Sequence, residues 1–340
     1  MSDAFSEVPI LPTLPPSLGD RLESLLLRGV LAWMGRGTLP EAYARAERLS
    51  RWGRRVLRKE WNWTLTNLRW VYGDQLSPAQ RERLAIRIFE NIFDSHLEGM
   101  RVQEVEVQCP GLERMRRALG EGRGGICCSI HLGGWEPALR LLGERGIPMA
   151  VVYRHANNPL SDQLFSQVRG AYGPGLTWHR RADVRGILRA LQGGRVLGLM
   201  TDINAREGGV TVPFLGIPAQ SMPGPARLAQ RFKVPVVPVL CVRDAPGRAT
   251  LHILDPLEPQ RGDDGGAETV EGLLFRINGA FEPWIHEYAE QYNWLHARWR
   301  SRPDGALWRP DAPWEALQAA RCAPFAPVSE RVRRMLALEG

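Results

Sequence analysis

A histidine and a carboxylate stand five positions apart in residues 131–136, which read His-Leu-Gly-Gly-Trp-Glu. A carboxylate that orients an imidazole makes the histidine a better general base toward a hydroxyl group. A histidine and a glutamate at this separation also arise often by chance, and alone they would be interpreted as a surface pair. We interpret His131 and Glu136 as a catalytic pair because of the elements that flank them.

The neighbouring residues predict a strand and then a helix. Residues 125–130 are apolar, compact and preceded by glycines, which is typical of a short buried strand. Pro137 fits the first position of a helix, where its missing N–H costs nothing. We therefore expect His131 at the carboxyl end of a strand and Glu136 at a helix N-terminus. Ligands bind at this edge of open α/β sheets.

Two further expected strands bring charged residues to the same edge. Arg154 and Asp202 each follow directly after one of these strands. Asn158 and Arg169 belong to the turn and the helix that follow Arg154. Taken alone, each arginine or aspartate fits a solvated cap or a salt bridge. Their convergence on one edge is what a catalytic cleft requires.

Strands and helices alternate over residues 106–303. This alternation predicts an α/β domain with a largely parallel, mixed sheet flanked by helices. Residues 210–216 alternate β-branched side chains and fit either an edge strand or the lining of a groove for an apolar chain. The expected strands are 125–130, 148–153, 195–201, 234–242 and 249–254, and the expected helices are 138–145, 160–171, 184–192, 223–232 and 269–292.

Helical patterns fill the chain before this domain. Residues 1–17 are expected to form a leader, residues 18–105 a helical segment, and residues 304–340 a Pro- and Ala-rich tail. Within the helical segment, residues 25–34 fit a core helix and a helix lying in a membrane interface equally well. The expected helices are 18–34, 39–57, 76–88 and 92–102, with an aromatic-rich stretch at 61–72.

The charge balance is basic and is carried by arginine. Of 340 residues, 44 are lysine or arginine, of which only Lys59 and Lys233 are lysines, and the formal net charge is +7. This balance suits phospholipid headgroups, phosphorylated glycolipids, acidic carrier proteins or nucleic acid. The 5 cysteines lack zinc-type spacing and predict a reducing compartment and no metal site. We expect no secretory signal, because the N-terminus is acidic and Pro-rich, and no apolar run reaches the ~18 residues that a membrane-spanning helix needs.

Five short motifs follow one another along residues 60–305. They are His131-x4-Glu136; Tyr-Arg-His-Ala-Asn-Asn-Pro-Leu at 153–160; Asp202-x-Asn204 with Gly-Gly-Val-x-Val-Pro-Phe-x-Gly at 208–216; Gly-Pro-Ala-Arg-Leu-Ala at 224–229; and Tyr-Asn-Trp-Leu-His-x-Arg-Trp-x3-Pro at 292–303. In this order and combination they resemble the bacterial lipid A biosynthesis (late) acyltransferase family, of the lauroyl and myristoyl transferase type.

The resemblance implies a glycerolipid-acyltransferase-like fold on the cytoplasmic face of the bacterial inner membrane, peripheral or anchored through the N-terminal helical segment. It implies transfer of a fatty acyl chain from an acyl carrier protein or coenzyme A thioester to a hydroxyl of a lipid A precursor or similar glycolipid. The thioester is a co-substrate, so no cofactor is implied. His131 would be the base, supported by Glu136, and the substrate-binding candidates are Arg154, Asn158, Arg169 and Asp202.

Several other functions stay open. The acceptor can be a glycerolipid, a phosphatidylinositol mannoside or an amino-acid lipid, and a thioesterase would use water instead. The chain lacks a Gly-x-Ser-x-Gly elbow, which favours direct transfer without an acyl-enzyme. A basic nucleic-acid-binding protein is a weaker alternative, because no helix-turn-helix, zinc or RNP signature is present. Candidate contacts for an acidic carrier protein, each of which alone fits a solvated helix face, are Arg180, Arg181, Arg185 and Arg189.

Overall fold

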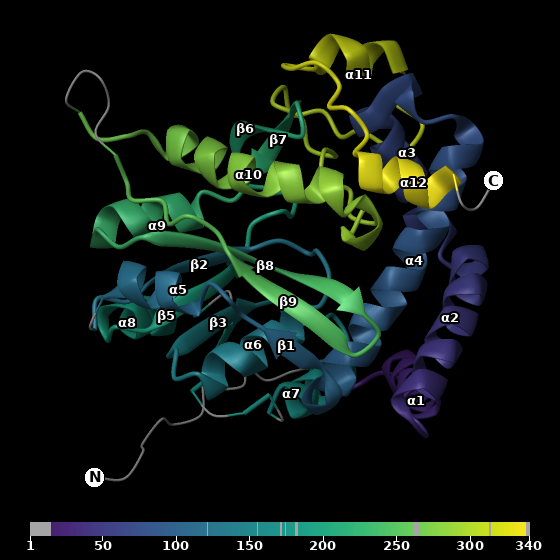
Figure 1. Cartoon of the computed structure of the whole chain (residues 1–340), viewed down its shortest axis with the longest axis horizontal. Coiled ribbons are helices and arrows are strands. Elements are labelled where there is room, and N and C mark those ends of the chain that lie inside the picture. The colour runs from purple at the N-terminus through teal and green to yellow at the C-terminus, as the bar shows by residue number, and fades with distance from the viewer. Residues whose placement is uncertain are drawn as a thin grey trace.

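The structure of the chain is a computed structural model, which describes residues 15–120, 122–154, 156–170, 172–173, 175–180, 183–260, 266–312 and 314–337. Most of the expected leader lies outside the described residues, and so does Arg181. A central mixed sheet carries helices on both faces, and the N-terminal helices stand along one end of it (Figure 1). The predicted α/β class with an N-terminal helical segment is confirmed.

The central sheet has seven strands in the order β1-β9-β8-β2-β5-β3-β4. Its neighbouring strands pair in parallel, except for β8 and β9, so the sheet is largely parallel and mixed as predicted. A separate hairpin is formed by β6 and β7. The strands are β1 Glu106–Gln108, β2 Gly125–Ser129, β3 Met149–Tyr153, β4 Thr177–Arg180, β5 Val196–Met200, β6 Val210–Phe214, β7 Ile217–Ser221, β8 Val236–Ala245 and β9 Arg248–Ile253.

Successive side chains of the buried strands pack alternately into two separate hydrophobic cores. In β2, Ile126 and Cys128 pack on the side of α8, α9 and α10, whereas Cys127 packs on the side of α5 and α6. Because helices cover both faces, such a strand reads as a continuous apolar run. The helices of this domain are α5 Leu112–Leu119, α6 Trp135–Glu144, α7 Pro159–Gly170, α8 Val184–Gln192, α9 Gly224–Phe232 and α10 Val270–Glu287.

The N-terminal helices form a layer against one end of the sheet (Figure 1). The two helices expected at 76–88 and 92–102 are a single helix, α4, and that prediction was wrong. No glycine or proline interrupts residues 88–92, and the Asn91 side chain donates to the Arg87 carbonyl one turn back, at 3.0 Å. The helices are α1 Leu18–Met34, α2 Leu39–Val56, α3 Arg58–Tyr72 and α4 Pro78–Met100.

The segment expected as a C-terminal tail packs on this N-terminal layer. Leu317, Val332 and Leu336 are buried. Trp308 meets Trp70 of α3 edge to face, with 5.3 Å between ring centroids. The helix expected at 269–292 ends at Glu287 and is followed by a 3-10 turn at Ala289–Gln291; the remaining helices are α11 Trp314–Ala320 and α12 Glu330–Ala337.

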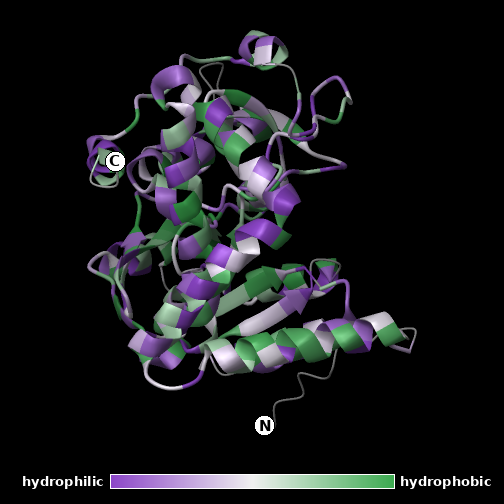
Figure 2. Ribbon diagram, turned by 90° about the vertical axis from the view of Figure 1, so that its right-hand side faces the viewer, coloured by the Kyte–Doolittle hydropathy of each residue, from purple (hydrophilic) through white to green (hydrophobic). Residues whose placement is uncertain are grey.

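Helix α1 is rich in hydrophobic residues (Figure 2), and several of its large apolar side chains are exposed. Leu18, Leu22, Leu25 and Leu26 are between 60% and 73% exposed. The helix contacts α2 and α7. Among the described residues, no helix combines the length and the apolar character needed to cross a membrane.

Candidate active site

His131 and Asp202 meet at the carboxyl edge of the sheet. They follow β2 and β5, which pair in parallel with Ser129 opposite Met200, so the two residues lie side by side. The Asp202 carboxylate accepts a hydrogen bond at 2.9 Å from the His131 backbone N–H and lies 2.8 Å from Nδ1 of the ring. The structure thus brings together two of the residues that the sequence singles out.

This pairing sets the tautomer of the imidazole. A carboxylate only accepts hydrogen bonds, so Nδ1 carries the hydrogen and Nε2 keeps its lone pair for a substrate proton. Burial disfavours the charge on both groups, but their mutual attraction outweighs it. The pKa of Asp202 falls to about 2, and the pKa of His131 rises above its usual value. The His131 side chain is 25% exposed and that of Asp202 is 0% exposed, so a substrate can reach only the imidazole.

Glu136 lies in the first turn of α6 and has different surroundings. Its Oε2 atom is buried and has no hydrogen-bond partner. Burial raises the pKa of this carboxyl group to about 8, against the opposing effect of the charges on His131 and Arg169. The hydrogen bond that was expected from Glu136 to the imidazole is made by Asp202. The catalytic role of Glu136 stays a prediction.

Arg169 of α7 contacts two neighbouring aromatic rings that meet each other edge to face. Its guanidinium carbon lies 4.6 Å from the ring centroid of Tyr153 and 5.3 Å from that of Trp178. Its charge lowers the pKa of the Glu136 carboxyl group, against the effect of burial, so the guanidinium lies near that carboxyl group. A stacked guanidinium keeps its N–H edge free for phosphate or carboxylate oxygens.

The two remaining predicted substrate-binding residues, Arg154 and Asn158, form no hydrogen bond with His131 or Asp202 in the described part of the chain. Arg154 follows β3 as expected, but its side chain is exposed and makes no hydrogen bond or ion pair within the described part of the chain. Asn158 is buried at the start of α7, where its Oδ1 accepts from the N–H of Leu160 at 3.0 Å. Its Nδ2 donates to the carbonyl of Asp20 at 2.9 Å, which ties α7 to α1. Without substrate, Asn158 therefore stabilises the start of α7 and its contact with α1 at the edge of the site.

Two residues to which the sequence analysis assigns no role complete the site. The His296 ring lies 5.0 Å from that of His131, centroid to centroid, and meets it edge to face. Burial and the charge of His131 lower the pKa of His296 to about 4, so this second imidazole is neutral. Burial and the charge of Asp202 hold the pKa of Tyr292 well above its usual value. The only signal for both residues is the 292–303 motif, which lies far along the chain from Asp202.

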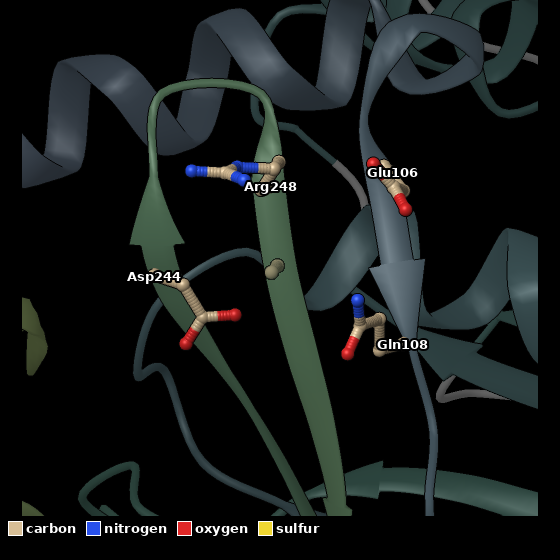
Figure 3. A pocket seen from close by; sticks show the side chains of 5 residues that line it. Glu106, Gln108, Asp244 and Arg248 are labelled. Atoms are coloured by element: carbon tan, nitrogen blue, oxygen red, sulfur yellow. The ribbon is translucent and has the colours of Figure 1, made fainter.

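Within the described ranges, no group of three or more His, Cys, Asp or Glu side chains is placed to hold a metal ion. A polar hollow lies elsewhere on the sheet and is formed by β1, β8 and β9 (Figure 3). None of the predicted site residues lines it. Its lining residues are Glu106, Gln108, Asp244, Arg248 and Ala249.

Comparison with known proteins adds a family to this geometry. Residues 23–301 match the family model of the bacterial lipid A biosynthesis acyltransferases. The chain is 26% identical over 298 residues to a lipid A biosynthesis lauroyltransferase of Escherichia coli (strain K12), covering 81% of this chain and 93% of that protein. It is 28% identical over 198 residues to a palmitoleoyltransferase of the same strain, covering 57% and 62%. It is 28% identical over 135 residues to a phosphatidylinositol mannoside acyltransferase of Mycobacterium tuberculosis (strain CDC 1551 / Oshkosh), covering 38% and 42%.

Proposed function

The chain belongs to the bacterial lipid A biosynthesis acyltransferase family, and from this premise we propose that it transfers a fatty acyl chain from a thioester to a hydroxyl group of a lipid A precursor or similar glycolipid. Membership of the family confirms the resemblance predicted from the motifs, and the chain is an acyltransferase. The observation that carries the mechanism is the hydrogen bond between the buried Asp202 and the accessible imidazole of His131.

His131 acts as the general base in this proposal. The acceptor hydroxyl gives its proton to Nε2, and its oxygen attacks the carbonyl carbon of the thioester. The C–S bond of the tetrahedral intermediate then breaks, and the thiol leaves with the proton that His131 held. Asp202 stays ionised and stabilises the imidazolium between the two steps. The new ester forms directly, so no residue of the chain is acylated.

Glu136 and Arg169 act together with the His131–Asp202 pair. When it is ionised, Glu136 supports His131 by favouring the imidazolium, and its charge contributes to the raised pKa of His131. Arg169 is held by cation–π contacts with Tyr153 and Trp178, whose rings meet edge to face. We assign to it the binding of a phosphate of the acceptor or of the developing oxyanion, since a preorganised cation stabilises such charge strongly.

An acidic acyl carrier protein fits as the donor of the acyl chain. The net charge of +7 favours an anionic partner. Arg185 and Arg189 are exposed one turn apart on α8, which offers two cations on one helix face. Coenzyme A thioesters carry phosphates and are the second donor to test.

Helix α1 gives the enzyme a surface toward a membrane. Its exposed leucines alternate with polar residues, which suits a helix lying in the plane of an interface. The contact of Asn158 with Asp20, and that of Ser161 with Glu23 at 3.5 Å, join α1 to the helix that carries Arg169. We propose that α1 lies on the cytoplasmic face of the inner membrane and brings a lipid acceptor to the site.

Acyl transfer by the wild type and by His131→Ala tests the function. The donors are acyl carrier protein and coenzyme A thioesters. The acceptors are lipid A precursors, lysophospholipids and a phosphatidylinositol mannoside, which is included because one relative is named for it. We expect an acylated lipid A precursor from the wild type and none from the variant. Release of thiol without an acylated lipid would make the enzyme a thioesterase. Acylation of another lipid alone would change the acceptor class.

A further inference from the structure

Arg243 of β8 is the centre of a buried polar network that the proposed mechanism does not use. Its guanidinium pairs with the Glu98 carboxylate of α4 through Nε and, at 2.8 Å, through Nη2. The two side chains are only 6% and 1% exposed. The same guanidinium donates to Asn91 and Ser95 of α4. A buried ion pair costs several kcal/mol of desolvation per ion, so it is weak evidence for stability and calls for another role.

The network surrounds Gly133, two positions after His131. Ser95 accepts a hydrogen bond from Nη2 of Arg243 at 2.9 Å, and its hydroxyl shares its one proton between the Asn91 carbonyl at 2.9 Å and the Gly133 carbonyl at 3.0 Å. On the other side, the N–H of Gly133 donates to the Gln291 carbonyl at 3.0 Å. The Gln291 side chain bonds both the N–H and the carbonyl of Arg243, each at 2.9 Å. Both polar groups of the Gly133 backbone are thus held by residues that Arg243 binds.

The backbone conformation of Gly133 and its close neighbour Cys241 leave no room for a side chain at this position. The φ of Gly133 is +62°, and a Cβ atom at this position would overlap the carbonyl oxygen of Cys241. The turn also determines where His131 lies, because the neighbouring carbonyl of His131 accepts from the N–H of Asn293 at 2.8 Å. A shift of this turn therefore moves the imidazole relative to Asp202 and to the substrate.

We propose that Arg243 is a positioning residue of the acyl-transfer reaction: its guanidinium holds the Gly133 turn through Ser95, its backbone holds the same turn through Gln291, and together they set the place of His131. The planar guanidinium meets Glu98, Asn91 and Ser95 at once. A lysine ammonium keeps the charge but does not present this fork of donors. The kinetic part of this inference rests on the proposed function, whereas the effect on the His131 ring does not.

The kinetic test compares Arg243→Lys and Ser95→Ala with a matched control, Arg276→Lys. Arg276 pairs with Glu268 at 3.0 Å, with side chains 25% and 11% exposed, and its hydrogen bonds reach no residue of the site. A displacement of about 1 Å can cost ~100-fold in rate, so we expect kcat to fall by up to ~100-fold in Arg243→Lys and by ~3- to 10-fold in Ser95→Ala. KM should change less than twofold, and Arg276→Lys should keep kcat within twofold.

A spectroscopic test is independent of activity. With ¹⁵N-labelled histidine, the His131 ring signals are assigned by their loss in His131→Gln. We expect both Arg243→Lys and Ser95→Ala to shift these signals, and Arg276→Lys to leave them unchanged. A folded Ser95→Ala variant with wild-type kcat and unchanged His131 signals would overturn the proposal, even if Arg243→Lys failed to fold. If the wild type transfers no acyl group but Arg243→Lys and Ser95→Ala still shift the His131 signals, the proposed function is refuted and the positioning role is kept.

Discussion

Two carboxyl groups act on the His131 imidazole: that of Asp202 is fully buried, and that of the partly buried Glu136 has a buried Oε2 atom. Asp202 takes two hydrogen bonds from His131, and its pKa falls to about 2. Glu136 leaves one oxygen unpaired, and its pKa rises to about 8. Burial alone raises the pKa of a carboxyl group, so the partners decide which of the two stays charged at neutral pH. Asp202 is therefore a fixed anion, the fixed side of this comparison, whereas Glu136 is its adjustable side and can gain or lose its charge.

The largest loss of kcat should follow the removal of the His131 imidazole, on which both carboxyl groups act. His131→Ala removes the base, and we expect kcat to fall by ~10³-fold or more in the acyl-transfer assay, because general base catalysis contributes up to ~10⁴-fold. Circular dichroism should show a native fold. Retention of the wild-type rate would show that His131 is not the base. The comparison of the two carboxyl groups would then have no bearing on the mechanism.

Asp202→Asn tests the fixed side. The amide can donate to Nδ1 and favour the tautomer that has its hydrogen on Nε2, which cannot take a proton from the acceptor. We expect kcat to fall by ~10²- to 10³-fold, since the remaining binding groups are untouched. A loss smaller than that of Glu136→Gln, measured under the same conditions, would reverse the assignment of the two sides.

Glu136→Gln tests the adjustable side and should cost only ~10-fold in kcat, because the ring keeps its hydrogen bond to Asp202. The pH profile of kcat/KM adds a sign. Glu136 has a pKa of about 8 and is mostly neutral at the pH where His131 loses its proton, so Asp202 is the main cause of the raised pKa of His131. The acid limb of the profile should therefore begin above the usual histidine value of ~6.5 in the wild type and stay there in Glu136→Gln. A limb that moved down by about one pH unit in this variant would show that Glu136 carries its charge in the free enzyme and would refute this assignment.

A substitution distant from both carboxyl groups is the reference for the comparison, because it should leave kcat almost unchanged. The double variant Leu22→Asp/Leu26→Asp places charges on the exposed face of α1, and binding to anionic phospholipid vesicles should fall by roughly 10-fold. With a detergent-dispersed acceptor, kcat should stay within twofold. Leu307 is 60% exposed on the C-terminal segment, so Leu307→Asp is a matched control that should not affect vesicle binding. Equal losses in both variants would argue against α1 as the membrane surface.

The sequence predicts the buried part of the fold better than its edges. The strands β2, β3, β5 and β8 are apolar runs because helices cover both faces of the sheet, whereas β9 alternates buried apolar residues with more exposed polar ones. The edge strand β4, which contains Trp178 and His179, is only half-buried and shows no such pattern. The N-terminal helices follow from their periodicity. The break expected near residue 90 is wrong, because Asn91 bonds back into its own helix and so does not interrupt it.

The site is less readable than the fold, because its pairing depends on strand order. His131 and Asp202 are 71 positions apart, and β3 and β4 lie between β2 and β5 in the chain but not between them in the sheet. The short spacing of His131 and Glu136 suggested a direct partner, yet that spacing places Glu136 in the first turn of α6. His296 comes near only because the last part of the domain folds back over the edge of the sheet.

The packing of Trp70 against Trp299 and Trp308 joins an early helix to a late segment of the chain. On the ribosome, Trp70 emerges about 230 residues before these partners, which at ~5–20 residues per second is a delay of roughly 10–50 s. During that time the aromatic side of α3 stays uncovered and open to aggregation. Synthesis of this enzyme therefore includes an interval in which a chaperone, or the membrane itself, has an apolar surface to protect.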